Sequence, residues 1–415
     1  MILDFEDFKK TINFQSVTYD EFKSRVSVLD ISDRSGQFNV RSDLPTFLQR
    51  VAKKDNRISR LETFYTKLYQ MLVTDAETSL RQWFDSYVNL QKSPEWYLTL
   101  PVGNSYDSEN NQFLGQKNAK YGRICKNINY NDFYNTKKLY ANDSEYVFGL
   151  MKAMYERFHL RNSMVGPAFF DHICKIENSY KTVWTDFMMG ANKASIFNPY
   201  TYKSILDVVF NGETLFAPVM GWNAYQIAFY NSNFKHFIAT DVMPNVVNNS
   251  HELHKLFKSR NENALFDFDE KTIDTYLCPS EQLDIKHDFV NKYRDSVDAV
   301  LFSPPYFDLE LYPGEGQSTT SFPNYEDWLE GYWRATVKLC KEVMRPGARF
   351  GFVISNFRNF DKVDNTISQD MKQVVEQELE FHKHYKVRWS AMSGSRQAHK
   401  TRDGNFEDLW VFEKM

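Results

Sequence analysis

The chain has 415 residues, of which 42% are hydrophobic and 25% are charged, and its formal net charge is −4. This composition is typical of a soluble globular protein, and the length allows about two domains. The slightly acidic balance argues against strong non-specific binding of nucleic acid, which depends on neutralising phosphates. The net charge does not exclude a local basic cleft.

Neither a membrane segment nor a metal site is indicated. The sequence holds no apolar run long enough to cross a membrane, and its first residues lack the basic start of a signal peptide. The four cysteines lack the spacing of metal ligands. We therefore expect a cytoplasmic protein with reduced thiols, no metal and no membrane contact. The cysteines are Cys125, Cys174, Cys278 and Cys340.

Residues 1–195 lack the alternation of strands and helices that marks an α/β domain. Segments 60–72 and 147–158 have apolar residues at helical spacing, whereas 103–112 is a polar stretch expected to be a loop. We expect a mostly helical N-terminal domain over residues 1–195 that serves target recognition or oligomerisation.

From residue 196 onward, strand-like and helical patterns alternate, which indicates a βαβ sheet in a second domain over residues 196–415. In chain order, the expected strands are 215–217, 237–241, 275–278, 297–302, 349–354, 385–391 and 408–412. The expected helices are 222–230, one that ends near Phe257, and 325–344.

The most informative stretch is the apolar strand 297–302 with the four residues after it, Ser303, Pro304, Pro305 and Tyr306. Two consecutive prolines cannot continue a strand ladder, and they fix a rigid turn. Such a turn suits a planar base with an exocyclic amine, because the serine hydroxyl and a carbonyl accept the amine protons while the ring stacks on the base. An ordinary strand-to-turn boundary is the alternative.

The sequence Ser303–Tyr306 resembles the catalytic (Asp/Asn/Ser)-Pro-Pro-(Tyr/Phe) motif of S-adenosylmethionine-dependent amino-methyltransferases, most of which methylate DNA. The resemblance covers about residues 196–415. It implies an α/β catalytic domain with the class I, Rossmann-like methyltransferase fold and a seven-stranded sheet. It also implies that Ser303, Pro304, Pro305 and Tyr306 are the catalytic residues.

The residues after the first expected strand suit a cofactor site. Gly221 lies between a strand and a helix, where a glycine lets the backbone approach a ligand closely. Asp241 ends the next strand, and an acidic residue at this place holds ribose hydroxyls in nucleotide-binding sheets. A helix cap is the alternative interpretation of Asp241.

The family resemblance implies that S-adenosylmethionine is the cofactor of this site. Ala217 and Asn223 stand where the family usually has an acidic residue and a second glycine. In the family, the loop after the third strand passes near the adenine ring, which makes Ser280 or Glu281 a candidate there. The expected cofactor-binding residues are Phe216, Pro218, Gly221, Trp222, Asp241, Ser280 and Glu281.

Two segments are candidates for substrate contacts. Residues 307–318, beginning with Phe307, combine aromatic residues with glycines and suit a flap beside a base pocket. Arg396, Lys400 and Arg402 lie in a loop between the last two strands, where they either contact phosphates or form a solvated hairpin. No segment between the cofactor loop and the catalytic turn is long enough for target recognition, which leaves residues 1–195 for that task.

The sequence therefore predicts methylation of an exocyclic amine, cytosine N4 or adenine N6, in a flipped base of DNA. RNA is a possible substrate, and a homodimer or partner subunit could form through the N-terminal domain. Its abundant Asn, Lys, Phe and Tyr fit an A/T-rich genome such as that of a phage or virus. The alternatives are the same fold acting on an RNA base or a protein glutamine, and a binding or scaffolding subunit without cofactor.

Overall fold

The computed structural model describes residues 98–115, 196–262, 271–307, 309–312, 314–356, 366–388 and 406–415, together with isolated residues between 20 and 138. The chain divides into two compact units. One comprises Met1–Asp85, Tyr134–Ala194 and Ser393–Gln397, and the other comprises Ser86–Phe133, Ser195–Met392 and Ala398–Met415. The predicted helical N-terminal domain lies largely outside the described residues and stays a prediction.

The second unit has an α/β fold around one mixed parallel and antiparallel sheet. Its parallel strands are β4 (Thr214–Ala217), β5 (His236–Asp241), β6 (Thr272–Leu277), β7 (Val297–Phe302) and β9 (Met344–Ile354). Strand β11 (Phe406–Glu413) runs antiparallel to both of its neighbours, β9 and β10 (Glu380–Arg388). The order across the sheet is β1-β2-β10-β11-β9-β7-β4-β5-β6.

In the part of the chain that the structure describes, this sheet has nine strands, so the prediction of seven is wrong. The two additional strands are β1 (Tyr106–Asp107) and β2 (Gln112–Phe113), in a segment predicted to be a loop. They form a hairpin whose second strand pairs with β10 in parallel, and the Phe113 ring lies 5.7 Å from the Tyr385 ring of β10. The predicted domain boundary at residue 195 stays a prediction.

The order of the strands creates a switch point between β4 and β7. Strands β4, β5 and β6 succeed one another toward one edge, whereas β7 and β9 continue from β4 toward the other. Connections on the two sides leave the sheet in opposite directions, which opens a crevice at the carboxyl ends of the central strands. Ligands of open α/β sheets bind in this crevice.

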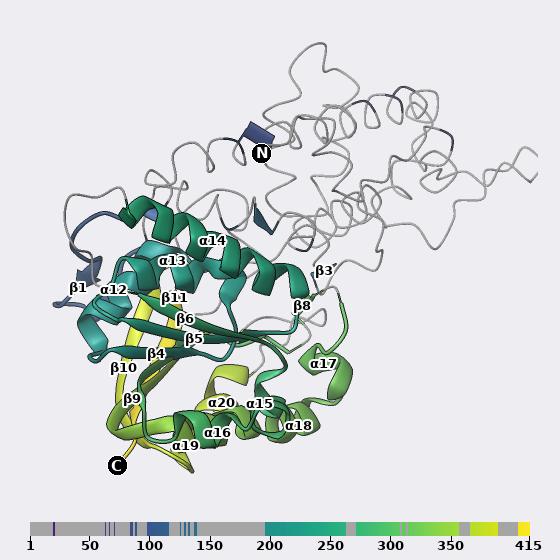
Figure 1. The fold of residues 1–415 in the computed structure, drawn as a ribbon. Helices are drawn as coiled ribbons and strands as arrows, with labels where there is room; N and C mark the ends of the chain where they lie inside the picture. Colours follow the sequence, from purple (N-terminus) through teal and green to yellow (C-terminus); the bar gives the residue numbers. More distant parts are fainter. Residues whose placement is uncertain are drawn as a thin grey trace, which may run out of the picture. The chain divides into compact units, whose positions relative to one another are not determined.

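Helices cover both faces of the sheet (Figure 1). One face carries α12 (Pro199–Val209), α13 (Ala224–Tyr230) and α14 (Pro244–Glu262), and the other carries α16 (Phe289–Tyr293), α19 (Ala335–Val343) and α20 (Ile367–Glu376). The remaining short elements are η1 (Gly221–Asn223), η2 (Ser280–Gln282), α15 (Leu283–His287), α17 (Ser318–Ser321), α18 (Tyr325–Trp328), the π-helix η3 (Leu329–Arg334), β3 (Lys137–Lys138) and β8 (Glu310–Leu311).

All seven predicted strands are confirmed as β4, β5, β6, β7, β9, β10 and β11, with shifts of a few residues at their ends. The predicted helix 325–344 forms as α18, η3 and α19, and it ends at Val343 ahead of the Pro-Gly stop signal. Buried aromatic rings of β7 and β9 fill the core beneath α19; Phe302 packs 5.8 Å from Trp333 and 6.0 Å from Phe350. No helix among the described residues is long and apolar enough to span a membrane.

Candidate active site

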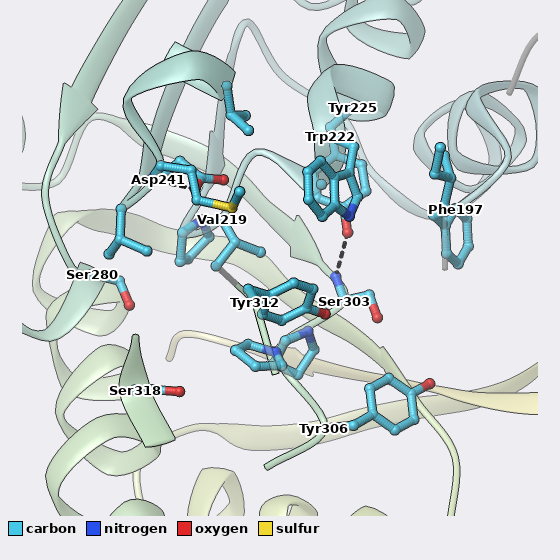
Figure 2. A pocket seen from close by; sticks show the side chains of 18 of the residues that line it. Phe197, Val219, Trp222, Tyr225, Asp241, Ser280, Ser303, Tyr306, Tyr312 and Ser318 are labelled. Carbon is cyan, nitrogen blue, oxygen red and sulfur yellow. Dashed lines mark hydrogen bonds between the residues drawn. The ribbon is translucent and has the colours of Figure 1, made fainter. Parts of the chain in front are cut away.

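A cavity of about 360 Å³ opens at the carboxyl ends of the strands that flank the switch point. The four strands β4 to β7 contribute residues to it: Val219 follows β4, Asp241 ends β5, Pro279 follows β6 and Ser303 follows β7. Figure 2 shows Asp241 and Tyr306 at opposite ends of this cavity, with Tyr312 between them. The sheet topology thus gathers the predicted cofactor side and the predicted target side into one space.

The loop after β4 has an unusual backbone. Gly221, Trp222 and Asn223 take left-handed φ angles of 53°, 58° and 63° in succession. A left-handed conformation is strained for residues with a Cβ, although Asn tolerates it better than most. Asn223 therefore adopts the left-handed backbone that a glycine adopts readily.

Buried amides hold this loop in place. The Asn223 side chain is fully buried; its Nδ2 donates to the Val246 carbonyl at 3.0 Å. Its Oδ1 accepts a hydrogen bond from Nδ2 of Asn129 at 3.0 Å, and the same Nδ2 lies 3.1 Å from the Trp222 carbonyl. Asn249 of α14 donates in turn to Asn129 at 3.0 Å. Satisfied buried amides of this kind offset the backbone strain and fix a single loop geometry.

Asp241 accepts hydrogen bonds from two backbone N–H groups, and its role toward a ligand stays a prediction. Its Oδ1 accepts the Met243 N–H at 3.0 Å ahead of α14, and its Oδ2 accepts the Met220 N–H at 3.3 Å. It also lines the cavity. Burial raises the pKa of the Asp241 carboxyl to about 6, although these backbone hydrogen bonds oppose the shift. Each oxygen can accept a further hydrogen bond from a ligand hydroxyl.

The loop after β6 offers one free acceptor. The Ser280 hydroxyl is engaged with Thr336 Oγ1 at 2.9 Å. Oε1 of Glu281 is buried and has no hydrogen-bond partner among the described residues, and burial raises the pKa of this carboxyl. Thr201 of α12, whose side-chain oxygen is likewise buried and unpartnered among these residues, also lines the cavity. Buried polar atoms without a partner destabilise the fold, so both positions suit a polar ligand.

The turn after β7 is anchored from α13. The Tyr225 hydroxyl accepts the backbone N–H of Ser303 at 2.9 Å, the contact drawn as a dashed line in Figure 2. The Tyr225 ring stacks on Tyr202 with a centroid distance of 4.3 Å, and the Tyr202 hydroxyl donates to the Leu301 carbonyl of β7. These contacts fix the backbone of the turn and leave the Ser303 side chain beside the cavity (Figure 2).

The far end of the cavity contains a carboxylate that the sequence analysis did not single out. Glu407 on β11 is 8% exposed and lines the cavity, and one of its oxygens accepts a hydrogen bond from the Tyr306 hydroxyl. Burial raises the pKa of Glu407 to about 7, with a further contribution from the charge of Asp408, while the bond from Tyr306 opposes the shift. Within the described residues, no Lys, Arg or His side chain forms an ion pair with Glu407.

Most of the predicted site residues meet in this one cavity. Those that line it are Pro218, Gly221, Trp222, Asp241, Ser280, Glu281, Ser303, Pro304, Pro305 and Tyr306. Of the predicted flap 307–318, the residues Leu309, Tyr312 and Gly316–Ser318 line it as well.

Two predicted residues, Phe216 and Phe307, do not line the cavity, and their binding roles stay predictions. Phe216 lies within β4 and is fully buried, with its ring 5.2 Å from Phe289 on the helical layer of α16. The Phe307 ring packs 5.6 Å from Trp328. Arg396, Lys400 and Arg402 lie outside the described residues, so their roles stay predictions.

The sequence carried a signal for Glu407 that went unused. Along β11 the buried residues Leu409 and Val411 alternate with less buried ones, and Glu407 has the same phase. Side chains of one phase point to one face of a strand, so a Glu at that phase is an acid on an apolar face. Tyr225, by contrast, occupies an apolar helix position and gave no such signal.

Comparison with protein-family models finds no match, and comparison with curated proteins finds none either. Among solved structures, the chain is similar to a protein of Thermus thermophilus provisionally named a DNA modification methylase, with 16% identity over 31% of this chain and 49% of that one and a TM-score of 0.23. The chain therefore spans about half the length of that protein.

Two further solved structures are similar over larger shares. N-methyltransferase NodS of Bradyrhizobium japonicum, in complex with S-adenosyl-L-homocysteine, is 10% identical over 49% of this chain and 78% of its own, with a TM-score of 0.28. Geranyl diphosphate methyltransferase in complex with SAM is 10% identical over 52% and 84%, with a TM-score of 0.34.

Proposed function

We propose that this chain is an S-adenosylmethionine-dependent methyltransferase that acts on the exocyclic amine of a base in DNA, cytosine N4 or adenine N6. The observation that carries the proposal is the single cavity at the switch point, lined at one end by Asp241 and Glu281 and at the other by Ser303–Tyr306. A methyl donor and an amine can meet in such a cavity without either one leaving its own binding residues.

The residues at the Asp241 end fit the cofactor. Asp241 has acceptor capacity for the two ribose hydroxyls, and the orphaned Oε1 of Glu281 is an acceptor for the amine of adenine. The buried hydroxyl of Thr201 is available to the polar methionine portion. When bound there, S-adenosylmethionine supplies an electrophilic methyl group, whose bond to sulfur breaks with the electron pair left on sulfur.

The residues at the other end fit a planar amine. The Ser303 hydroxyl and the Pro304 carbonyl accept hydrogen bonds from the exocyclic amine, which orients its lone pair and raises its electron density. Tyr306 stacks on the base. A base inside a duplex cannot reach a cavity of this kind, so the target nucleotide turns out of the helix. Catalysis then consists mainly of positioning and electrostatics.

Binding of the nucleic acid requires cations, and the cavity itself supplies few. Arg388 lines its edge, and the Arg396, Lys400 and Arg402 loop follows in the chain. We propose that this loop contacts phosphates and that the N-terminal unit takes part in target recognition or in assembly with a second subunit.

The proposal is tested by calorimetric titration of the chain with S-adenosylmethionine, followed by methyl-transfer assays on DNA, RNA and protein with a labelled donor. We expect cofactor binding and labelled DNA amines. Transfer to RNA or protein alone would reassign the substrate. A chain that binds no cofactor would support the alternative of a binding or scaffolding subunit.

Replacing Asp241 with Ala should weaken S-adenosylmethionine binding by roughly 1.5–3 kcal/mol, because charge-assisted hydrogen bonds to hydroxyls are lost. Asp241→Asn is the matched variant: it keeps an oxygen for the Met243 N–H but removes the charge. Calorimetry on both variants separates the roles. If both bind cofactor as wild type does, Asp241 is a backbone cap and nothing more.

Replacing Tyr306 with Ala should remove stacking of about 1–3 kcal/mol per base and reduce turnover. Cofactor affinity should change little, because Tyr306 lies at the end of the cavity away from Asp241 (Figure 2). Steady-state kinetics beside calorimetry checks this. Loss of cofactor binding together with the folded state would identify Tyr306 as a core residue instead.

A further inference from the structure

Glu407 is a buried acid that the proposed function does not yet use. It sits one residue after the start of β11, opposite Val387 of β10, and both residues line the cavity beside Tyr306. Ser355, which follows β9, and Arg388 of β10 complete this corner. The corner therefore belongs to the target side of the cavity and is built from the three strands β9, β10 and β11.

An ionised carboxylate in this position destabilises the folded chain. Burial of a charge without a cationic partner destabilises a protein, and an amide or apolar residue would accept the Tyr306 hydroxyl or fill the space at lower cost. One oxygen of Glu407 accepts the Tyr306 hydroxyl. The second oxygen makes no hydrogen bond to a described residue, and it is not completely enclosed by the protein. The structure thus keeps one carboxylate oxygen available.

We propose that Glu407 is the catalytic base that takes the proton released when the exocyclic amine is methylated. This inference rests on the proposed function. Methylation replaces one N–H bond of the amine by an N–C bond: the nitrogen lone pair forms the new bond to carbon, and the electron pair of the broken N–H bond stays on nitrogen. The proton moves to the free oxygen of Glu407 and from there to water.

The charges around Glu407 fit this role. Tyr306 donates to it from the turn after β7, and Asp408 adds a negative charge from β11 but is itself paired with His384 of β10 at 2.9 Å. Arg388 on β10, the Tyr225 hydroxyl on α13 and the Tyr312 hydroxyl after β8 are further titratable groups of the described residues on the cavity wall near the turn. A base works best when its pKa lies near the operating pH, and burial raises that of Glu407 to about 7.

The test is Glu407→Gln, which keeps an oxygen for the Tyr306 hydroxyl but cannot take a proton. We expect cofactor affinity and circular dichroism like those of wild type and a kcat lower by about 100-fold or more. In wild type, kcat/KM should rise with pH through about 7, and the variant should lose this acidic limb. Glu413→Gln at the more exposed end of β11 is the matched control and should retain wild-type kinetics.

Tyr306→Phe supplies a second, independent signature. It keeps the ring but removes the hydrogen bond that lowers the pKa of Glu407, so the acidic limb should move to higher pH. Carbon-13 NMR of the cofactor-free chain should show a carboxyl that titrates near 7 and that is absent from Glu407→Gln.

A Glu407→Gln variant with wild-type kcat and an unchanged pH profile would overturn the inference while leaving the proposed function intact. A slower Glu407→Gln variant that retains the acidic limb would overturn it too, because Glu407 would then only position Tyr306. A wild-type chain that neither binds S-adenosylmethionine nor transfers methyl groups would overturn the proposed function itself, and the inference with it.

Discussion

Replacing Gly221 with Ala is expected to destabilise the chain by about 2–5 kcal/mol and to weaken S-adenosylmethionine binding about 100-fold. Two effects add up. Gly221 has a φ angle of +53°, and a Cβ there would lie 2.3 Å from Cζ of Tyr225. The Tyr225 ring cannot move aside freely, because it stacks on Tyr202 and its hydroxyl holds the Ser303 N–H. The substitution therefore disturbs the cofactor loop and the Ser303 turn together.

The measurements are chemical denaturation for stability and calorimetry for binding. Gly347→Ala is the matched control, because Gly347 also has a positive φ angle, +77°, but a Cβ there would meet no atom within 4 Å. This control should show the backbone strain of about 1–2 kcal/mol without a change in cofactor affinity. Equal losses in both variants would mean that the contact with Tyr225 has no part in the effect.

Replacing Glu407 with Gln is expected to stabilise the chain at alkaline pH by on the order of 3 kcal/mol relative to wild type. The pKa of Glu407 is raised from 4.5 to about 7 on folding, mainly by burial. Its contribution to stability is fully present below the unfolded pKa and is lost as the pH rises through the folded pKa. Glutamine carries no charge at any pH, so the variant escapes this loss.

The free energies of unfolding of both proteins are to be measured from about pH 4 to about pH 8. Their difference should grow across the window between 4.5 and about 7 and then level off. Glu380→Gln on the neighbouring strand β10, an exposed carboxylate without an ion pair among the described residues, corrects for the general effect of such an exchange. A difference that stays constant with pH would show that Glu407 titrates alike in the folded and unfolded chain, and it would also remove one support for its role as a base.

Much of the second unit follows from short-range patterns in the sequence. The strand Val297–Phe302 is a mostly apolar run. Pro304 and Pro305 end it independently of tertiary contacts, because two prolines cannot continue a strand. Asp241 follows a run of buried residues in the same way. Because the carboxyl ends of parallel strands share one edge of a sheet, Asp241 and Ser303 lie at the same edge.

Other features depend on pairings between distant parts of the chain, which no local pattern encodes. The hairpin of β1 and β2 belongs to the sheet because Gln112 and Phe113 pair with the edge of β10 that β11 does not occupy. The hydrogen bond between Tyr306 and Glu407 joins residues that are 101 positions apart in the sequence. The hydrogen bond between Ser303 and Tyr225 joins residues that are 78 positions apart. Such contacts are set by which strands pair and in which register.

The sequence by itself therefore determined the strands, the rigid turn and the acid at the end of β5, since these follow from hydrophobic periodicity and proline geometry within a few residues. Only the tertiary structure decided that Gly221 faces the Tyr225 ring and that Glu407 enters the cavity. The reason is that packing between layers fixes distances between side chains, whereas periodicity fixes only the face on which each side chain lies.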